Sequence, residues 1–212
     1  MSGSSIGRLA VDISFYFDVG SPNAFLTHRV LPAIEERTGA TFTYVPILLG
    51  GLFKLTGNQS PMTAFAGIAN KPQYQMLEMR RFIARHGIVD FRMNPHFPIN
   101  TLQLMRGAVA AEGLGLLAPY VAHIFDDMWV RGLNLGEPAV MAESLHQAGL
   151  PADRILAASQ QPEVKQQLVD NTQAAFDHGA FGSPSFLVGN ELFFGKDRLR
   201  DVEEEIMRAG RS

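Results

Sequence analysis

Alternating hydrophobic and polar positions open the chain, and a helical pattern follows them. Residues 10–19 (AVDISFYFDV) alternate and are rich in β-branched and aromatic side chains, which predicts a β-strand. An apolar face with helical spacing then runs to Gly39, and Pro32 is expected to kink this helix. Residues 41–49 (TFTYVPILL) predict a second strand. A strand, a helix and a strand in this order predict parallel strands joined by a right-handed crossover.

From position 61 to 178 the chain shows only helical patterns, and then strands return. The predicted helices cover residues 72–87, 101–112, 116–130, 137–148, 151–159 and 162–178. Residues 184–195 (PSFLVGNELFFG) predict a β-hairpin that turns at Gly189 and Asn190. Residues 196–210 predict a closing amphipathic helix.

Joining the two ends of this pattern gives a small sheet with helices. We therefore predict an α/β protein: a thioredoxin-like fold with a large all-helical domain inserted in the middle of the chain. Residues 11–60 and 179–212 would form the discontinuous thioredoxin-like domain, and residues 61–178 the inserted helical domain. Residues 1–10 (MSGSSIGRLA) are small and polar, and we expect a disordered N-terminus there.

Composition narrows the classes of function. The 212 residues include no cysteine, which excludes a disulfide oxidoreductase with its own thiols and any cysteine-ligated metal. The formal net charge of −3 argues against a nucleic-acid partner, since phosphate binding needs a concentrated basic face. No apolar run approaches the roughly 18 residues of a membrane span, and the first residues lack the apolar core of a signal peptide. We therefore expect a cytoplasmic protein without a membrane partner.

Ser21 and Pro22 follow the first predicted strand and begin a helix. Serine is a common N-cap and proline suits the first helical position, so the pair can be read as a helix start only. The other reading is that the helix start and the Ser21 hydroxyl stabilise a thiolate brought by another molecule. A hydrolase nucleophile is excluded at Ser21, because Pro22 has no N–H for an oxyanion hole, and at Ser183, which precedes Pro184.

Pro184 opens the first strand of the predicted hairpin. Thioredoxin-like proteins place a cis-proline here, and we predict that the Ser183–Pro184 bond is cis and that Ser183 offers its backbone to an extended ligand. A trans-proline in an ordinary turn is the alternative. Lys196 and Asp197 precede the last helix. Asp197 could cap that helix, or both side chains could bind a zwitterionic ligand.

Two further segments carry candidate binding residues. Residues 50–58 (GGLFKLTGN) match neither the phosphate-binding loop nor the dinucleotide fingerprint. Lys54 and Asn58 could reach into a cleft between sheet and insertion, and an ordinary glycine-rich loop with a solvated lysine is the alternative. Arg92 precedes a proline-rich turn and could pair with a substrate carboxylate, or lie on the surface without a role.

Four separated segments together resemble the 2-hydroxychromene-2-carboxylate isomerases. These enzymes belong with the kappa-class glutathione transferases in a DsbA-like branch of the thioredoxin fold. The segments are FYFDVGSPNAFL, LLGGLFKLTGN, FPINT and FGSPSFLVGNELFFGKDRL, and they occur in this order over nearly the whole chain. The resemblance implies glutathione as the cofactor, a small aromatic carboxylate as the substrate and a homodimer as the assembly.

The resemblance also implies roles for the residues around the cofactor. Ser21 would be the catalytic residue and hold the glutathione sulfur as a thiolate. Asn58 would contact glutathione or the substrate. Ser183, before the cis-Pro184, would grip the cysteinyl backbone of glutathione.

The remaining implied contacts are charged. Lys196 and Asp197 would contact the γ-glutamyl end of glutathione. Lys54 and Arg92 are similar to basic residues near the substrate carboxylate.

The implied reaction converts 2-hydroxychromene-2-carboxylate, or a close analogue, to trans-o-hydroxybenzylidenepyruvate in the degradation of naphthalene and related aromatics. A thiolate adds to the conjugated substrate, the former double bond rotates, and elimination returns glutathione unchanged. Two alternatives remain open: a glutathione transferase that conjugates electrophiles, and a non-catalytic thioredoxin-like binding domain.

Overall fold

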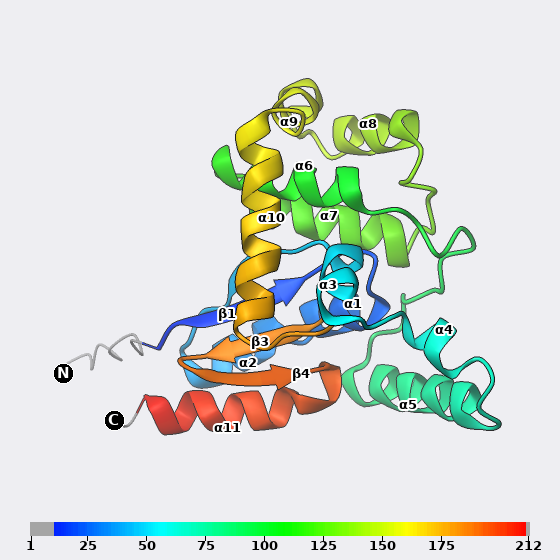
Figure 1. The fold of residues 1–212 in the computed structure, drawn as a ribbon, viewed down its shortest axis with the longest axis vertical. Helices are drawn as coiled ribbons and strands as arrows, with labels where there is room; N and C mark the ends of the chain where they lie inside the picture. The colour runs from blue at the N-terminus through cyan, green and yellow to red at the C-terminus, as the bar shows by residue number, and fades with distance from the viewer. Residues whose placement is uncertain (1–10, 211–212) are drawn as a thin grey trace, which may run out of the picture.

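The structure is a computed structural model that describes residues 11–210. The expected disordered N-terminus, residues 1–10, lies outside the described part of the chain. Figure 1 shows the elements, which in chain order are β1 (Ile13–Phe17), α1 (Pro22–His28), α2 (Leu31–Thr38), β2 (Thr43–Pro46), α3 (Leu49–Thr56), α4 (Pro61–Phe65), α5 (Lys71–His86), α6 (Leu102–Gly113), α7 (Leu117–Trp129), α8 (Pro138–Gln147), α9 (Ala152–Ala158), α10 (Pro162–Asp177), β3 (Ser185–Val188), β4 (Glu191–Phe194), the 3-10 turn η1 (Lys196–Arg198) and α11 (Leu199–Ala209). The six helices predicted between positions 72 and 178 are confirmed as α5 to α10.

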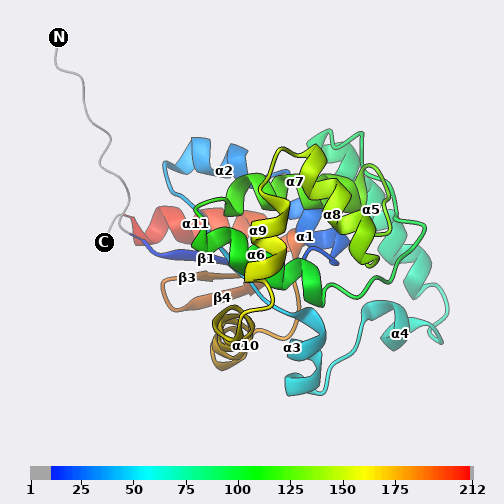
Figure 2. The ribbon, with the colours of Figure 1, turned by 90° about the horizontal axis from the view of Figure 1, so that it is seen from above.

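The strands form one four-stranded sheet in the order β2-β1-β3-β4. β1 pairs with β2 in parallel, as predicted, and with β3 antiparallel, so that Phe15 stands between Tyr44 and Phe186. β3 and β4 form the predicted hairpin. Figure 2 shows α10 and α3 on one face of this sheet and α2 and α11 on the other.

Two helices replace the single kinked helix that the first pattern predicts. α1 ends at His28, and Pro32 lies in the first turn of α2 rather than inside one continuous helix. A proline lacks the N–H that an interior helical position donates, so the chain restarts the helix at this point. Gly39 ends α2 with a φ of 70°, a left-handed conformation that glycine adopts without a steric penalty.

The alternative of a glycine-rich loop at residues 50–58 is wrong about the backbone, because residues 49–56 form the helix α3, although Lys54 is exposed as that alternative expects. Leu52 is fully buried on α3 and joins a cluster with Tyr16 of β1 and Ala175 of α10. Packing of this one face stabilises a helix that its two glycines disfavour locally. The sequence also missed α4, which follows Ser60, a serine whose side chain caps its first turn.

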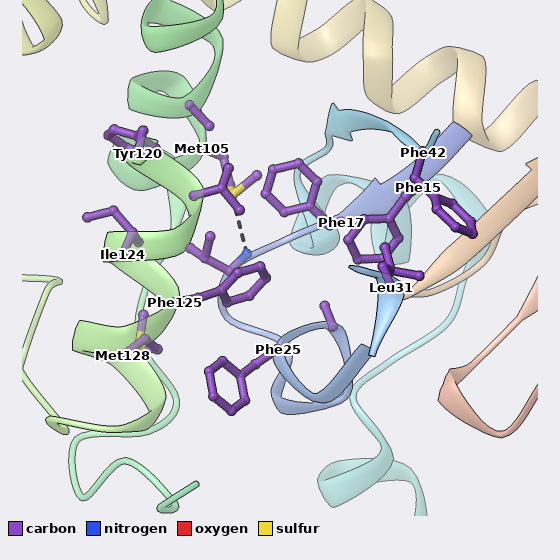
Figure 3. Packing of buried hydrophobic residues seen from close by; sticks show 14 of the residues in the cluster. Phe15, Phe17, Phe25, Leu31, Phe42, Met105, Tyr120, Ile124, Phe125 and Met128 are labelled. Carbon is purple, nitrogen blue, oxygen red and sulfur yellow. Dashed lines mark hydrogen bonds between the residues drawn. The ribbon is translucent and has the colours of Figure 1, made fainter. Parts of the chain in front are cut away.

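A shared aromatic core joins the helices to the sheet. Phe15 and Phe17 of β1 face this core, and the ring centroid of Phe17 lies 6.0 Å from that of Phe125 on α7 (Figure 3). The Val19 N–H donates to the sulfur of Met105 on α6 at 3.4 Å, and the Trp129 indole donates to the Val19 carbonyl at 2.8 Å. These contacts hold the end of β1, and therefore the start of α1, against α6 and α7. The predicted domain boundaries at positions 60 and 178 stay a prediction.

Within residues 11–210, no helix has the length and apolarity required to cross a membrane.

Candidate active site

A cavity of about 400 Å³ opens where the start of α1 meets the segment that precedes the strand β3. Its walls come from the first residues of α1 and α3, from α4 and α5, from the loop before α6, and from residues around positions 182 and 196. Five residues that the sequence predicts for a ligand site line it together: Ser21, Asn58, Ser183, Lys196 and Asp197.

Ser21 is the N-cap of α1, as predicted. Its Oγ accepts a hydrogen bond from the Ala24 N–H at 3.2 Å and donates one to the Ser183 carbonyl oxygen at 2.9 Å. The residue is 4% exposed, yet it lines the cavity. No described residue accepts a hydrogen bond from the Asn23 N–H, which stands in the same first turn. The site thus presents a hydroxyl and a backbone donor side by side, an arrangement that suits an anion.

The Ser183–Pro184 peptide bond is cis, as predicted. Ser183 is buried, and its Oγ accepts a hydrogen bond from the Asp18 N–H at 3.1 Å. No partner in the described part of the chain accepts from the Ser183 N–H, and β3 begins only at Ser185. This free donor beside the cavity can bind the backbone of an extended ligand. Pro184 is buried behind Ser183 and does not line the cavity.

Asp18 is a site residue that the sequence analysis missed. Its carboxylate is 1% exposed and accepts hydrogen bonds from the N–H groups of Gly20 and Leu49, each at 2.8 Å, and from the Thr101 hydroxyl at 3.0 Å. Burial raises the pKa of this carboxyl, and the three donors oppose that effect. Asp18 could have been predicted from the sequence, because an acidic residue at the buried end of a hydrophobic strand needs hydrogen-bond partners.

Lys196 is a buried cation at the other end of the cavity. It is 5% exposed, its Nζ lies 2.6 Å from Asp197 Oδ1, and it stands 5.0 Å from the centre of the Phe82 ring. Glu78 of α5 lines the same region. A hydrogen bond from Arg81 lowers the pKa of Glu78, and the charge of Lys196 acts in the same direction. The cavity wall therefore carries one cation, Lys196, and two carboxylates, Glu78 and Asp197.

The expectation that Asp197 caps the last helix is wrong. α11 begins at Leu199 with Arg198 at its N-cap position, and no side chain caps it. Asp197 lies one turn earlier, in η1, where its carboxylate binds Lys196. The other reading of the pair, a charged group at a ligand site, agrees with its place in the cavity wall.

The last three predicted residues separate in space. Asn58 lines the cavity, and its Nδ2 donates to the Phe181 carbonyl at 2.9 Å, which ties the end of α3 to the segment before Ser183. Lys54 and Arg92 are exposed and do not line the cavity. The cavity gives no support to their assignment to a substrate carboxylate, which stays a prediction.

Part of the cavity wall is apolar and rich in methionine. Its large side chains come from α3, α4, α5 and the loop before α6: Phe53, Met62, Tyr74, Met76, Met79, Met93 and Phe97. Met62 is 59% exposed and Tyr74 58% exposed, so that this wall is open to solvent on one side. Flexible thioether side chains adapt to ligands of varied shape. The cavity therefore joins a polar end, suited to a charged peptide-like ligand, to a wall suited to an apolar group.

Comparisons with known proteins agree with this description. Residues 12–207 match the family described as DSBA-like thioredoxin domain. The chain is 25% identical over 195 residues to a 2-hydroxychromene-2-carboxylate isomerase of Sphingobium xenophagum, covering 92% of this chain and 97% of that protein. It is 24% identical over 212 residues to the human glutathione S-transferase kappa 1, covering 92% and 90%.

A solved structure of a 2-hydroxychromene-2-carboxylate isomerase superposes on the chain with a TM-score of 0.80 at 23% identity, covering 94% of this chain and 96% of that one. The thioredoxin-like fold with many added helices is thereby confirmed, as is the resemblance that the four sequence segments carry.

Proposed function

The chain belongs to the family of DSBA-like thioredoxin domains, and on that premise we propose that it is a glutathione-dependent cis–trans isomerase of 2-hydroxychromene-2-carboxylate or a close aromatic analogue. The observation that carries the proposal is the pairing of Ser21 with the backbone of Ser183 inside one cavity. In a chain without cysteine this pair has no thiol of its own to act on, so the sulfur must come with a ligand.

The donors of the cavity fit glutathione. Glutathione has a peptide backbone around its cysteine and a γ-glutamyl end with an ammonium and a carboxylate. The unpaired Ser183 N–H suits that backbone. Lys196 suits the carboxylate, and Asp197 with Glu78 suits the ammonium, because opposite charges lie together at this end. Asn58, between Phe53 and Ser60 on the cavity wall, is a further polar contact.

When bound, glutathione supplies a thiolate nucleophile that can add reversibly to a conjugated double bond. The part of the protein is to keep that sulfur deprotonated, since a free cysteine thiol has a pKa of about 8.5. The Ser21 hydroxyl can donate a hydrogen bond to the sulfur once the Ser183 carbonyl oxygen accepts a hydrogen bond from a ligand N–H instead. The Asn23 N–H adds a second donor at the same place. Hydrogen bonds to the charged form lower the pKa of the thiol.

One observation favours a second candidate, a glutathione transferase that conjugates electrophiles. Lys196 is the one basic side chain in the cavity wall among residues 11–210, and in the proposed complex it binds the γ-glutamyl carboxylate of glutathione. The apolar wall thus offers no free cation to a substrate carboxylate, whereas it suits a neutral electrophile. Both candidates use the same sulfur site at Ser21 and differ only in the second substrate.

An ultraviolet assay separates these functions. Conversion of 2-hydroxychromene-2-carboxylate is followed with and without reduced glutathione, while total thiol is titrated. Glutathione-dependent conversion at constant total thiol would establish the isomerase. Loss of thiol with a neutral aromatic electrophile, and no isomerisation, would establish the transferase. Absence of glutathione binding by calorimetry would refute both and leave the non-catalytic binding domain.

We further propose that the enzyme is a cytoplasmic homodimer in aromatic degradation. The assembly and the pathway are implied by the resemblance that the four sequence segments carry, and a chain without cysteine suits a reducing compartment. Sedimentation equilibrium of the purified protein tests the dimer directly, because a single species of monomer mass would contradict it.

A further inference from the structure

Asp18 is a buried carboxylate that the proposed chemistry does not use. It does not line the cavity, and no cation of the described chain pairs with it within salt-bridge distance. Its three hydrogen-bond donors come from three different places: the loop before α1 (Gly20), the start of α3 (Leu49) and the start of α6 (Thr101). One side chain thus joins the three segments that meet behind the cavity.

The backbone of Asp18 holds the two serines of the site. Its N–H donates to Ser183 Oγ at 3.1 Å, and its carbonyl oxygen accepts from the Ser21 N–H at 3.0 Å. A displacement of Asp18 would therefore disturb a hydrogen bond to each of the two serines. The Ser21 Oγ to Ser183 carbonyl contact depends on both positions.

The loop at Asp18 is also tightly packed. A Cβ atom at Gly20 would lie 2.7 Å from the Thr101 methyl group and 3.3 Å from Asp18 Oδ1. Only glycine fits this position without a shift of Thr101. The Thr101 methyl group therefore packs against the loop at Gly20, while the Thr101 hydroxyl donates a hydrogen bond to the Asp18 carboxylate.

We propose that Asp18 is a positioning residue for the reaction proposed above: its carboxylate fixes Ser21 and Ser183 against the starts of α3 and α6. The role needs a carboxylate, because all three partners donate and a carboxylate only accepts. An amide would bring its own N–H₂ group against one of these donors.

Four variants test this role. Asp18→Asn replaces an acceptor by a donor, and Thr101→Val removes one of the three hydrogen bonds without changing any charge. Thr101→Ser keeps the hydroxyl and serves as the rescue. Asp127→Asn is the matched control, because Asp127 is also a fully buried carboxylate but bonds Ser144, His123 and Arg131 away from the cavity.

The measurements are kcat, KM for glutathione, and the pKa of the bound thiol from an ultraviolet pH titration. We expect Asp18→Asn to lose about 100-fold in kcat, the scale of a misplaced catalytic group, and to raise the thiol pKa. KM for glutathione should rise much less than kcat falls, because the charged contacts of Lys196 and Asp197 are untouched and only the Ser183 contact is disturbed. Thr101→Val should show the same pattern more weakly. Thr101→Ser keeps the hydroxyl but loses the methyl group beside Gly20, so it should retain a higher kcat and a lower thiol pKa than Thr101→Val. Asp127→Asn should lower only the melting temperature.

A folded Asp18→Asn variant with wild-type kcat and thiol pKa would overturn the positioning role. So would an equal loss of kcat in Asp127→Asn, which would indicate a general effect of buried carboxylates. If Asp18→Asn does not fold, Thr101→Val decides, and wild-type values there overturn the role. A wild-type protein without glutathione binding or turnover would overturn the proposed function and this role together, which distinguishes the two failures.

Discussion

The Ser21 hydroxyl lies 2.9 Å from the Ser183 carbonyl oxygen, although 162 positions separate the two residues. The antiparallel pairing of β1 with β3, in which Tyr16 lies opposite Ser185, places the end of β1 beside the start of β3 and explains the contact. The Ser21 Oγ also accepts from Ala24, so that its single proton is committed to Ser183. A ligand N–H that donates to the Ser183 carbonyl oxygen would therefore replace Ser21 there. The Ser21 O–H would then be free to donate a hydrogen bond to the ligand's sulfur.

Ser21→Ala removes this hydroxyl. We expect kcat/KM to fall about 100-fold, the usual loss for one donor to a developing anion, and the pKa of the bound thiol to rise. Loss of the N-cap should lower the free energy of unfolding by only about 1 kcal/mol. Steady-state kinetics well below the melting temperature and a thiol titration check both effects. Ser21→Thr keeps the hydroxyl and the cap, and a matching loss in that variant would contradict the assignment.

Lys196→Met tests the charged end of the cavity. Lys196 is buried, whereas its partner Asp197 has a side chain that is 67% exposed, so the substitution leaves no buried unpaired charge. We expect the Kd for glutathione to rise by roughly 10-fold or more, the value of one charge-assisted hydrogen bond, with little change in stability. Calorimetry measures the Kd. Lys71→Met is the control, because Lys71 is an exposed lysine on α5 outside the cavity wall.

Arg92→Met tests the substrate contact implied by the resemblance. The Arg92 side chain is exposed and does not line the cavity. The backbone N–H of Arg92 donates a hydrogen bond to the Trp129 carbonyl oxygen at 2.7 Å. A side-chain substitution leaves that backbone bond intact. We expect an unchanged KM for a carboxylate substrate, and likewise for Lys54→Met. A rise in KM in either variant would instead support the contact that the resemblance implies.

Local sequence predicts the parts of the site that depend on the backbone. Ser21 was found because serine is a common N-cap before a proline at the first helical position. Ser183 was found only because thioredoxin-like proteins place a cis-proline at this position. Glu78 and Met79 were missed because a helical pattern fixes their spacing but not the surface that the helix covers. The helix α3 was missed for a related reason: the burial of Leu52 outweighs two local glycines, and that burial depends on α10.

Gly107→Ala probes the packing of the inserted helices. A Cβ atom at Gly107 would lie 2.3 Å from the hydroxyl oxygen of Tyr120, whose side chain is fully buried and bonds the Leu104 carbonyl at 2.7 Å. We expect a loss of about 1–3 kcal/mol in the free energy of unfolding, as for other overpacked cores. Gly113→Ala is the control on the same helix, since no atom lies within 4 Å of its Cβ position. Urea denaturation of both variants should separate them, and equal midpoints would contradict the packing.

His28 makes the stability of the fold depend on pH. Burial, together with the Arg29 cation, lowers the pKa of His28 from 6.5 to about 4. Its Nδ1 lies 2.7 Å from the Tyr44 hydroxyl, and its ring stacks on Phe125 at 5.1 Å, a site built for the neutral imidazole.

Because the folded protein disfavours protonated His28, the unfolded chain binds this proton more readily. The contribution of neutral His28 to the free energy of unfolding is therefore complete above pH 6.5, and it is lost as the pH falls through 4. The loss reaches about 3 kcal/mol.

Carboxylates that bind arginine, such as Glu203, also weaken the fold in acid, so the wild type must be compared with His28→Asn. Asparagine keeps an acceptor for Tyr44 but does not titrate. Urea unfolding at about pH 7 and about pH 4 should show the stability advantage of the wild type shrinking in acid. An advantage that is constant over this range would show that His28 keeps an ordinary pKa in the folded protein.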